Sequence, residues 1–191
     1  NLYVAYRNGN AVWKMNGAGT SWTRVLSESM PVGLPVDGAN DLYATNSSPE
    51  TLNYGVVKLV TPDGSSSGWA TALQRSPAYP TALATPRLPS GELDPSPSTV
   101  WMLDAAPQPN CIRAINIGAL SSTCRVSIGN LGGYPAGLTW TRSGHLLYTR
   151  GNAVYELDAA GSPVTSYHAL SGVTLSGPGP LAVDRYGDVP P

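Results

Sequence analysis

The segment GNAVWKMNGAG at residues 9–19 recurs as GNAVYELDAAG at 151–161, with the flanking glycines, the Asn, the Ala and the Val at identical places. GVVKLVTPDG at 55–64 fits the same pattern after one length adjustment, and CIRAINIGA at 111–119 fits it more loosely. Alternating apolar residues that lead into a turn are typical of a strand and its exit. The sequence therefore predicts one strand-and-turn unit that occurs four times.

Each of these segments belongs with two further predicted strands. Both lie before it in the chain, except that the segment at 9–19 has one strand before it and the other at 180–184. The second strands of the units are NLYVAY at 1–6, DLYATN at 41–46, TVWMLD at 99–104 and HLLYTR at 145–150. The first strands are GLPVD at 33–37, ALATP at 82–86, GLTWT at 137–141 and PLAVD at 180–184. A less regular fourth strand follows, as in SWTRVLS at 21–27 and PVTSYHAL at 163–170. Four-stranded antiparallel units that recur about every 40–58 residues predict the blades of a β-propeller, since such a small sheet must stack on its neighbours.

Composition supports an all-β fold. Hydrophobic residues make up 41% of the 191 residues and charged residues only 12%, which disfavours long helices with charged outer faces. The 21 glycines and 18 prolines are scattered along the chain, as expected for many short elements separated by turns. We therefore expect a single domain over residues 1–188.

The unit reads small-Leu-x-Val-Asp, then Gly-Asn/Asp-Leu-Tyr-Val, then Asn-x-Val-x-Lys-Leu. It resembles the NHL family of propeller repeats, most clearly in GLPVDGANDLYATN, GNAVWKM and PLAVDRYGD. The resemblance is good over 1–20, 31–64 and 134–188 and poor over 77–130. It implies a binding platform for proteins, carbohydrates or RNA, and a related minority of such propellers are enzymes.

The chain begins inside one unit and ends with the first strand of another. The predicted blades are 1–28 with 179–185, 31–76, 80–131 and 134–177. We expect the C-terminal strand to complete the first blade, because shared backbone hydrogen bonds would close the ring without an open edge. Alternatively, the chain is part of a larger ring, or the strand completes a blade of a neighbouring molecule and produces a filament. Residues 189–191 would begin a proline-rich tail.

Charge and hydropathy exclude two classes of partner. The net charge is −1 and the 11 basic residues form no run, so nucleic acid is not an expected partner. No stretch approaches the 18 or so apolar residues of a membrane-spanning helix, so membrane insertion is not expected.

Two cysteines indicate an oxidising compartment. If the segment around them is a hairpin that turns at 116–119, pairing places Cys111 opposite Cys124, and the sulfurs can form a disulfide. A bond that closes so short a loop contributes roughly 3 kcal/mol in the chain-entropy model. Asn46 begins a glycosylation sequon, Asn-Ser-Ser. Both features favour an extracellular or cell-surface protein.

Carboxylates at the mouth of the ring are the main candidates for a site. Asp37 and Asp184 occupy one repeat position, where the other units carry Thr141 and, approximately, Pro86. Two acids with nearby carbonyl groups could hold a calcium ion. The alternative is that each Asp accepts backbone N–H bonds and caps the turn after its strand.

The long segment 62–98 interrupts the blade spacing and carries Trp69 and Tyr79. Aromatic rings in a loop on a rigid ring suit a sugar or a protein partner. The alternative is an insertion that covers a blade edge. The two histidines, His145 and His168, fall on different strands of one blade, so a zinc site with three converging ligands is not expected.

These observations favour a secreted or cell-surface, non-catalytic interaction or structural module that binds protein or glycan through its blade loops and could assemble into polymers. No catalytic residue, metal ligand or resident cofactor is nominated. The alternative is an extracellular lyase, lactonase or glycan-active enzyme with its site at the central channel. An enzyme should show a metal or at least three convergent polar side chains there, and a binding module a channel filled by apolar or small residues.

Overall fold

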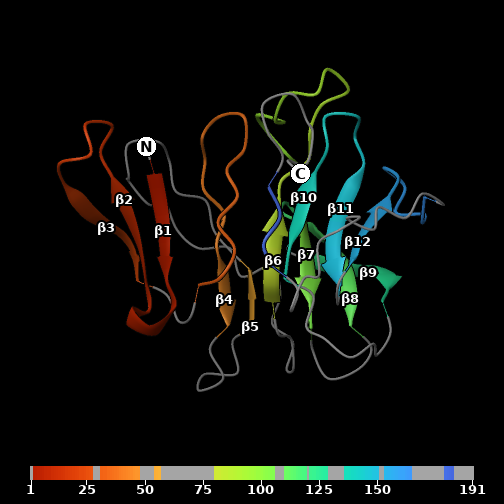
Figure 1. Ribbon diagram of the computed structural model, residues 1–191, viewed down its shortest axis with the longest axis horizontal. Helices are drawn as coiled ribbons and strands as arrows, with labels where there is room; N and C mark the ends of the chain where they lie inside the picture. Colours follow the sequence, from red (N-terminus) through yellow and green to blue (C-terminus); the bar gives the residue numbers. More distant parts are fainter. Residues whose placement is uncertain are drawn as a thin grey trace.

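A computed structural model of the chain describes residues 2–27, 31–47, 54–56, 80–105, 110–119, 121–128, 136–150, 153–164 and 179–182. Within these residues the regular structure is entirely β, apart from one turn of 3-10 helix, η1 (Arg7–Gly9). The strands form antiparallel sheets that follow one another in chain order (Figure 1). The predicted all-β fold is confirmed.

The described residues form four sheets, and each lies inside one predicted blade. Sheet 1 contains β1 (Leu2–Tyr6), β2 (Ala11–Met15) and β3 (Trp22–Ser27), and sheet 2 contains β4 (Thr45–Ser47) and β5 (Tyr54–Val56). Sheet 3 contains β6 (Pro80–Ala84), β7 (Thr99–Asp104), β8 (Cys111–Asn116) and β9 (Ser121–Ser127) in that order. Sheet 4 contains β10 (Leu138–Trp140), β11 (Leu146–Arg150) and β12 (Ala153–Leu157). Sheet 3 therefore has the predicted four-stranded meander of a blade.

The connection from the first to the second strand of a blade is the same tight turn in three units. Asn40, Gly91 and Gly144 occupy equivalent places in these turns, with φ values of 67°, 86° and 81°. This left-handed conformation costs little for Gly and is tolerated by Asn, whereas other side chains are strained there. The turn residues of the repeat are therefore fixed by backbone geometry.

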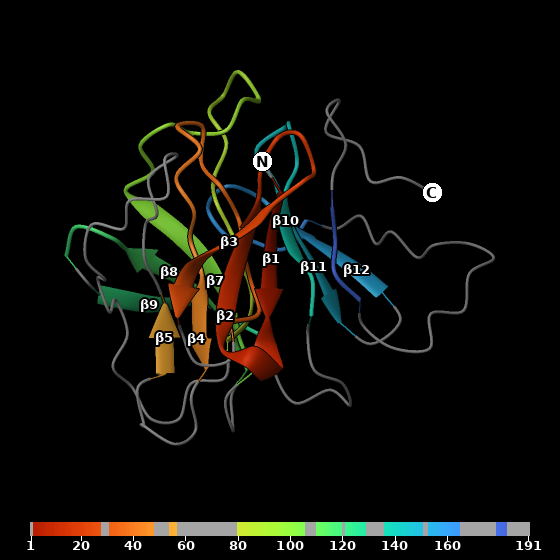
Figure 2. The ribbon, with the colours of Figure 1, turned by 90° about the vertical axis from the view of Figure 1, so that its left-hand side faces the viewer.

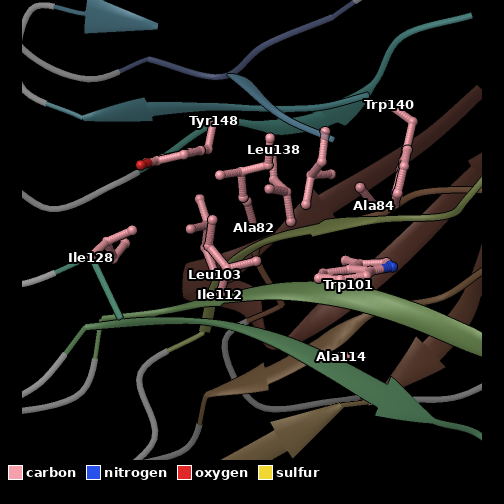
Figure 3. Close-up of a cluster of buried hydrophobic side chains, with 12 residues drawn as sticks. Ala82, Ala84, Trp101, Leu103, Ile112, Ala114, Ile128, Leu138, Trp140 and Tyr148 are labelled. Atoms are coloured by element: carbon pink, nitrogen blue, oxygen red, sulfur yellow. The ribbon is translucent and has the colours of Figure 1, made fainter. Parts of the chain in front are cut away.

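The larger core lies between sheets 3 and 4 (Figure 3). Trp101 on β7 and Trp140 on β10 meet edge to face, with ring centroids 5.7 Å apart and an interplanar angle of 73°. Leu103, Ile112 and Leu146 beside them are at most 1% exposed. Because neighbouring sheets interdigitate in this way, each sheet depends on the next for burial of its apolar side chains.

A smaller core joins sheets 1 and 2. Val12 on β2 packs with Leu42 and Ala44, and all three are fully buried. Partly buried apolar side chains surround this group: Tyr3, Val25, Leu34 and Val36. Sheet 1 therefore buries one of its faces against the second blade.

The hairpin of β8 and β9 corrects the predicted register. Cys111 lies opposite Ser127, and Cys124 lies opposite Arg113. The hairpin closes at the pair Asn116 and Ser121, so its turn starts later in the chain than the predicted turn at 116–119. A bulge between Ile112 and Arg113 then adds one further residue to β9. The disulfide between Cys111 and Cys124 is nevertheless present, with the two Cα atoms 5.8 Å apart.

Completion of the first blade by the C-terminal strand stays a prediction. Among the described residues, sheet 1 consists of β1, β2 and β3 only, and it lies at the opposite end of the long axis from sheet 4 in Figure 1. Residues 179–182 lie beside sheet 4, where the Thr149 hydroxyl donates to the carbonyl of Gly179 at 3.0 Å. Residues 183–185 of the predicted strand lie outside the described part of the chain.

Candidate binding site where the innermost strands meet

A cavity of about 370 Å³ lies where the innermost strands of successive blades converge. Its wall is made of residues 32–35, 81–85, 136–140 and 180–182, with Arg87 and Leu93 at its border. These segments are the predicted first strands of four successive units. The volume falls within the range of about 300–1,000 Å³ that is usual for ligand pockets.

Small residues bring the first strands close together. A Cβ atom at Gly33 would lie 2.8 Å from the backbone nitrogen of Leu83, and a Cβ atom at Gly137 would lie 2.8 Å from that of Leu181. Larger side chains would therefore push the strands apart. Residues 179–182 therefore pack against the first strand of the fourth blade in the same way that β6 packs against the first strand of the second blade.

A threonine on the second strand of the second and fourth units holds the same contact. The Thr45 hydroxyl accepts hydrogen bonds from the backbone N–H of Val32 at 2.8 Å and of Gly33 at 3.2 Å. The equivalent hydroxyl of Thr149 accepts one from the N–H of Gly137 at 2.8 Å. These bonds satisfy buried backbone donors where the ladder is irregular.

The cavity wall is largely apolar or small, with few polar groups. Among the described residues of the wall, Arg87 is the one charged residue, and its guanidinium donates from Nε to the carbonyl of Trp140 at 3.2 Å and from Nη1 to that of Gly91 at 2.7 Å. Two wall residues also contain donors that are buried from solvent and have no hydrogen-bond partner in the structure, the Thr81 hydroxyl and the Trp140 indole N–H. Because these two atoms have almost no accessible surface, they do not face the cavity.

Asp37 lies outside the cavity wall and is only 2% exposed. One carboxylate oxygen accepts from the N–H of Ala39 and of Asp41, each at 2.9 Å, and the other accepts from the Tyr43 hydroxyl at 3.1 Å. Burial raises the pKa of Tyr43, and the adjacent Asp37 carboxylate raises it further. The structure therefore gives Asp37 the turn-capping contacts of the alternative interpretation.

Thr141 has a similar local role. Its hydroxyl accepts from the N–H of His145 at 3.0 Å and lies 2.8 Å from the Ser143 hydroxyl. The His145 ring contacts the carboxylate of Glu156 on β12. Neither Thr141 nor Asp37 belongs to the described cavity wall, so the structure places neither of these predicted site residues at the cavity.

The remaining candidates cannot be placed at the site. Asp184, Trp69 and Tyr79 lie outside the described residues. Asn46 of the sequon lies on β4 opposite Gly55, and its side chain is outside the described part.

Sequence reasoning missed the residues that give the cavity its polar character. Arg87 and Thr81 lie in the stretch where the repeat pattern is poorest, so no template position marked them. Trp140 lies on β10, a predicted first strand, so its position in the repeat could have marked it as a residue of the cavity wall.

The residues that the structure describes contain no group of three or more His, Cys, Asp or Glu side chains that could hold a metal ion. The buried Asp104 carboxylate pairs with Arg113 at 2.6 Å and is thereby used within sheet 3. Among the same residues, no helix is long and apolar enough to cross a membrane.

Solved structures with the same architecture cover nearly the whole chain. A chain from a crystal structure of a nidogen/laminin complex aligns over 92% of this chain with a TM-score of 0.68 at 15% identity. A virginiamycin B lyase from Staphylococcus aureus aligns over 93% with a TM-score of 0.62 at 15% identity. A gluconolactonase from Xanthomonas campestris aligns over 93% with a TM-score of 0.63 at 19% identity.

The chain is a β-propeller. It covers 64%, 54% and 60% of these three structures, which is less than two thirds of each. No protein-family model and no curated protein sequence matches the chain. At these identities the structural likeness identifies the fold, and the propellers that share it include enzymes as well as a chain of a protein complex.

Proposed function

We propose that this propeller is a non-catalytic, NHL-like interaction module that binds a protein partner at the cavity formed by its first strands. The observation that carries the proposal is the described cavity wall, which combines apolar and small residues with the guanidinium of Arg87. Such a wall suits recognition by shape and hydrogen bonding. The carboxylate of Asp37, the predicted acid that the structure describes, is occupied by its own turn.

An extracellular or cell-surface location is part of this proposal. The disulfide of Cys111 and Cys124 supports it, because structural disulfides persist in oxidising compartments. The likeness to a chain of a nidogen/laminin complex supports a protein as the partner. Glycan binding, a calcium ion at the rim and polymer formation by strand donation remain predictions from the sequence.

The second candidate is an enzyme that works at the same cavity. Its support is the cavity volume of about 370 Å³, together with the lyase and the gluconolactonase among the similar structures. Such an enzyme would need convergent acid, base or metal-binding groups. The described cavity wall offers Arg87 and threonine hydroxyls for this purpose.

The first test separates the two candidates. The purified chain is assayed for hydrolysis of gluconolactone and for cleavage of virginiamycin B, with and without added Ca²⁺ and Mg²⁺. We expect no turnover above the background reaction. Saturable turnover that Arg87→Gln abolishes would overturn the non-catalytic assignment.

The second test addresses binding. A displayed peptide library is selected on the wild-type chain, and the enriched peptides are then measured against Arg87→Gln and against Arg125→Gln on exposed β9 as the matched control. Loss of a charge-assisted hydrogen bond should weaken binding at least about tenfold in Arg87→Gln alone. No enrichment, or equal binding to both variants, contradicts the proposed site.

A further inference from the structure

Two arginines contact one turn beside the cavity. Arg87 at the cavity border donates from Nη1 to the carbonyl of Gly91. The side chain of Arg142, from the equivalent turn of the fourth unit, lies against the same glycine, since a Cβ atom at Gly91 would fall 2.1 Å from its Cγ and 2.7 Å from its Nε. The lack of a Cβ atom at Gly91 therefore lets both cationic side chains contact this turn.

The turns that carry these arginines lie at one edge of the propeller. In Figure 1, and again in Figure 2 after a rotation of 90°, the turns between the first and second strands of the second, third and fourth units lie at the top. Neighbouring turns touch there, because the N–H of Gly38 donates to the carbonyl of Asp94 at 2.9 Å. Arg87 and Leu93 extend the cavity wall toward this edge. A chain that lies across the edge would therefore meet Arg87.

Neither arginine forms an ion pair with a residue that the structure describes. The guanidinium of Arg87, which is partly buried, donates to the carbonyls of Trp140 and Gly91, and both acceptors are neutral. Glu92, the chain neighbour of Gly91, is exposed and pairs with neither arginine. A partly buried guanidinium in a largely apolar wall is stabilised by an opposite charge. The wall therefore favours an anionic ligand.

Arg87 also departs from the repeat. The pairs that close the three equivalent turns place Arg87 at the position of Val36 in the second unit and of Trp140 in the fourth. Those two side chains pack in the cores between sheets. A charged residue at a position that otherwise serves packing needs a compensating interaction. The two carbonyls supply hydrogen bonds to Arg87 but no negative charge.

We propose that the protein partner of this cavity presents an acidic side chain, Asp or Glu, whose carboxylate binds Arg87 and Arg142 while a neighbouring apolar side chain enters the cavity. This inference rests on the proposed function and names the chemistry of the partner segment. The guanidinium of Arg87 has N–H groups left on Nη1 and Nη2 for carboxylate oxygens, and its two carbonyl bonds fix its orientation beforehand. Arg142 is exposed and adds a second positive charge beside the border.

The wall favours a side chain over the end of a partner chain. Its described residues are largely apolar or small and offer few groups to which a backbone N–H or C=O could bond. We therefore expect the partner backbone to stay above the turns in water, so that only its side chains reach the border and the cavity. An Asp or Glu next to a Leu, Ile or Val satisfies both the charge of Arg87 and the apolar wall.

The experiment measures binding of the intact chain to four arrays of N-acetylated hexapeptides that are randomised around a fixed central pair. Three arrays have an amidated C-terminus and carry Glu-Leu, Gln-Leu or Lys-Leu. The fourth carries Gln-Leu with a free C-terminal carboxylate. We expect strong binding in the Glu-Leu array alone.

The best Glu-Leu peptide and its Gln-Leu counterpart are then titrated against the wild type and three variants. With the wild type, Glu-to-Gln replacement in the peptide should weaken binding at least about tenfold. With Arg87→Gln the two peptides should bind equally, because the coupled partner is gone. Arg142→Gln should weaken the Glu-Leu peptide severalfold, and Arg125→Gln on exposed β9 is the matched control without effect. Raising NaCl from about 0.05 M to about 0.5 M should weaken the Glu-Leu peptide more than the Gln-Leu peptide.

The other outcomes separate this inference from the proposed function. Equal binding of the Gln-Leu array, with loss in Arg87→Gln, overturns the acidic partner but keeps the binding site. Binding that requires a free C-terminal carboxylate overturns the side-chain assignment. No binding in any array overturns both proposals. Circular dichroism verifies that Arg87→Gln folds; should it fail to fold, the same peptide pair measured on exposed Arg142→Gln decides, and an undiminished preference for Glu-Leu there contradicts the inference.

Discussion

Sheets 1 and 3 are built from the same repeat, yet they differ in how their two faces are buried. On β7 of sheet 3, the neighbours Met102 and Leu103 point to opposite faces and are both fully buried. On β1 of sheet 1, Tyr3 is half-buried while Val4 beside it is 40% exposed. A blade therefore gains its second buried face from a neighbour, and the stability of each position depends on its place in the stack as much as on its residue.

The largest expected effect comes from the same substitution at equivalent positions of a sheet covered on both faces, sheet 4, and of sheet 1. It tests whether burial by a neighbouring sheet determines the stability of a position. Leu146→Ala in sheet 4, at a residue 1% exposed, should lower the free energy of unfolding by about 3–4 kcal/mol. Leu2→Ala, at a residue 51% exposed, should lower it by less than about 1 kcal/mol. Urea denaturation of dilute protein measures both. Equal losses would mean that sheet 1 is covered in solution.

Removal of the disulfide measures a stabilisation that sheet 3 has and sheet 1 lacks. Replacing both Cys111 and Cys124 by Ala should cost about 3 kcal/mol, because the bond joins residues 13 apart and restricts the unfolded chain. The midpoint of urea denaturation reports the loss, and titration of free thiols in the parent protein checks that the bond is formed. A parent protein with two reactive thiols would contradict the disulfide.

The turns of the second and fourth units offer a smaller contrast. Asp37→Ala leaves the backbone N–H groups of Ala39 and Asp41 and the buried Tyr43 hydroxyl without their acceptor, which should cost about 2 kcal/mol. Thr141→Ala at the same repeat position should cost less, since Thr141 is 9% exposed against 2% for Asp37 and its hydroxyl accepts from one backbone N–H, that of His145. Added Ca²⁺ should not restore Asp37→Ala. Stabilisation of the wild type by Ca²⁺ in the same thermal melts would instead favour the calcium hypothesis.

The smallest predicted effect compares Tyr43 with Tyr3, which occupies the same position in sheet 1. Burial raises the pKa of both phenols, and the shift is large at Tyr43, where Asp37 adds to it. A pKa raised by folding gives stability that is complete below the unfolded value of about 10 and is lost as pH rises above it. Wild-type stability should therefore fall at alkaline pH. Tyr43→Phe, which costs about 1 kcal/mol at neutral pH, should flatten this fall more than Tyr3→Phe does.

The pattern of the sequence predicted the strands better than their connections. TVWMLD coincides with β7, and the alternating residues after Gly9 and Gly151 coincide with most of β2 and β12, because period-two alternation follows directly from strand geometry. The predicted register of the β8–β9 hairpin was wrong, since its turn lies later in the chain than predicted and a bulge adds one more residue between Ile112 and Arg113. Pattern alone cannot locate a bulge of this kind.

The candidate site was less predictable than the fold. Repeat position correctly grouped Asp37 with Thr141, but both side chains bond within their own turns. Arg87 is placed at the cavity by its hydrogen bonds to the carbonyls of Trp140 and Gly91, and the bond to Trp140 depends on how separate blades meet. Such properties arise from tertiary structure and leave no local pattern in the chain.

The close approach at Gly33 and Gly137 has a consequence for how this cavity can change over time. Backbone atoms rather than side chains fix the spacing between adjacent first strands there. The width of the cavity therefore depends on these two glycines and on the threonines that bond beside them. Substitution of the other wall residues would leave this width unchanged. The ligand specificity of the cavity can therefore change while its width stays constant. A new specificity would be engineered most safely by replacing wall side chains and keeping both glycines.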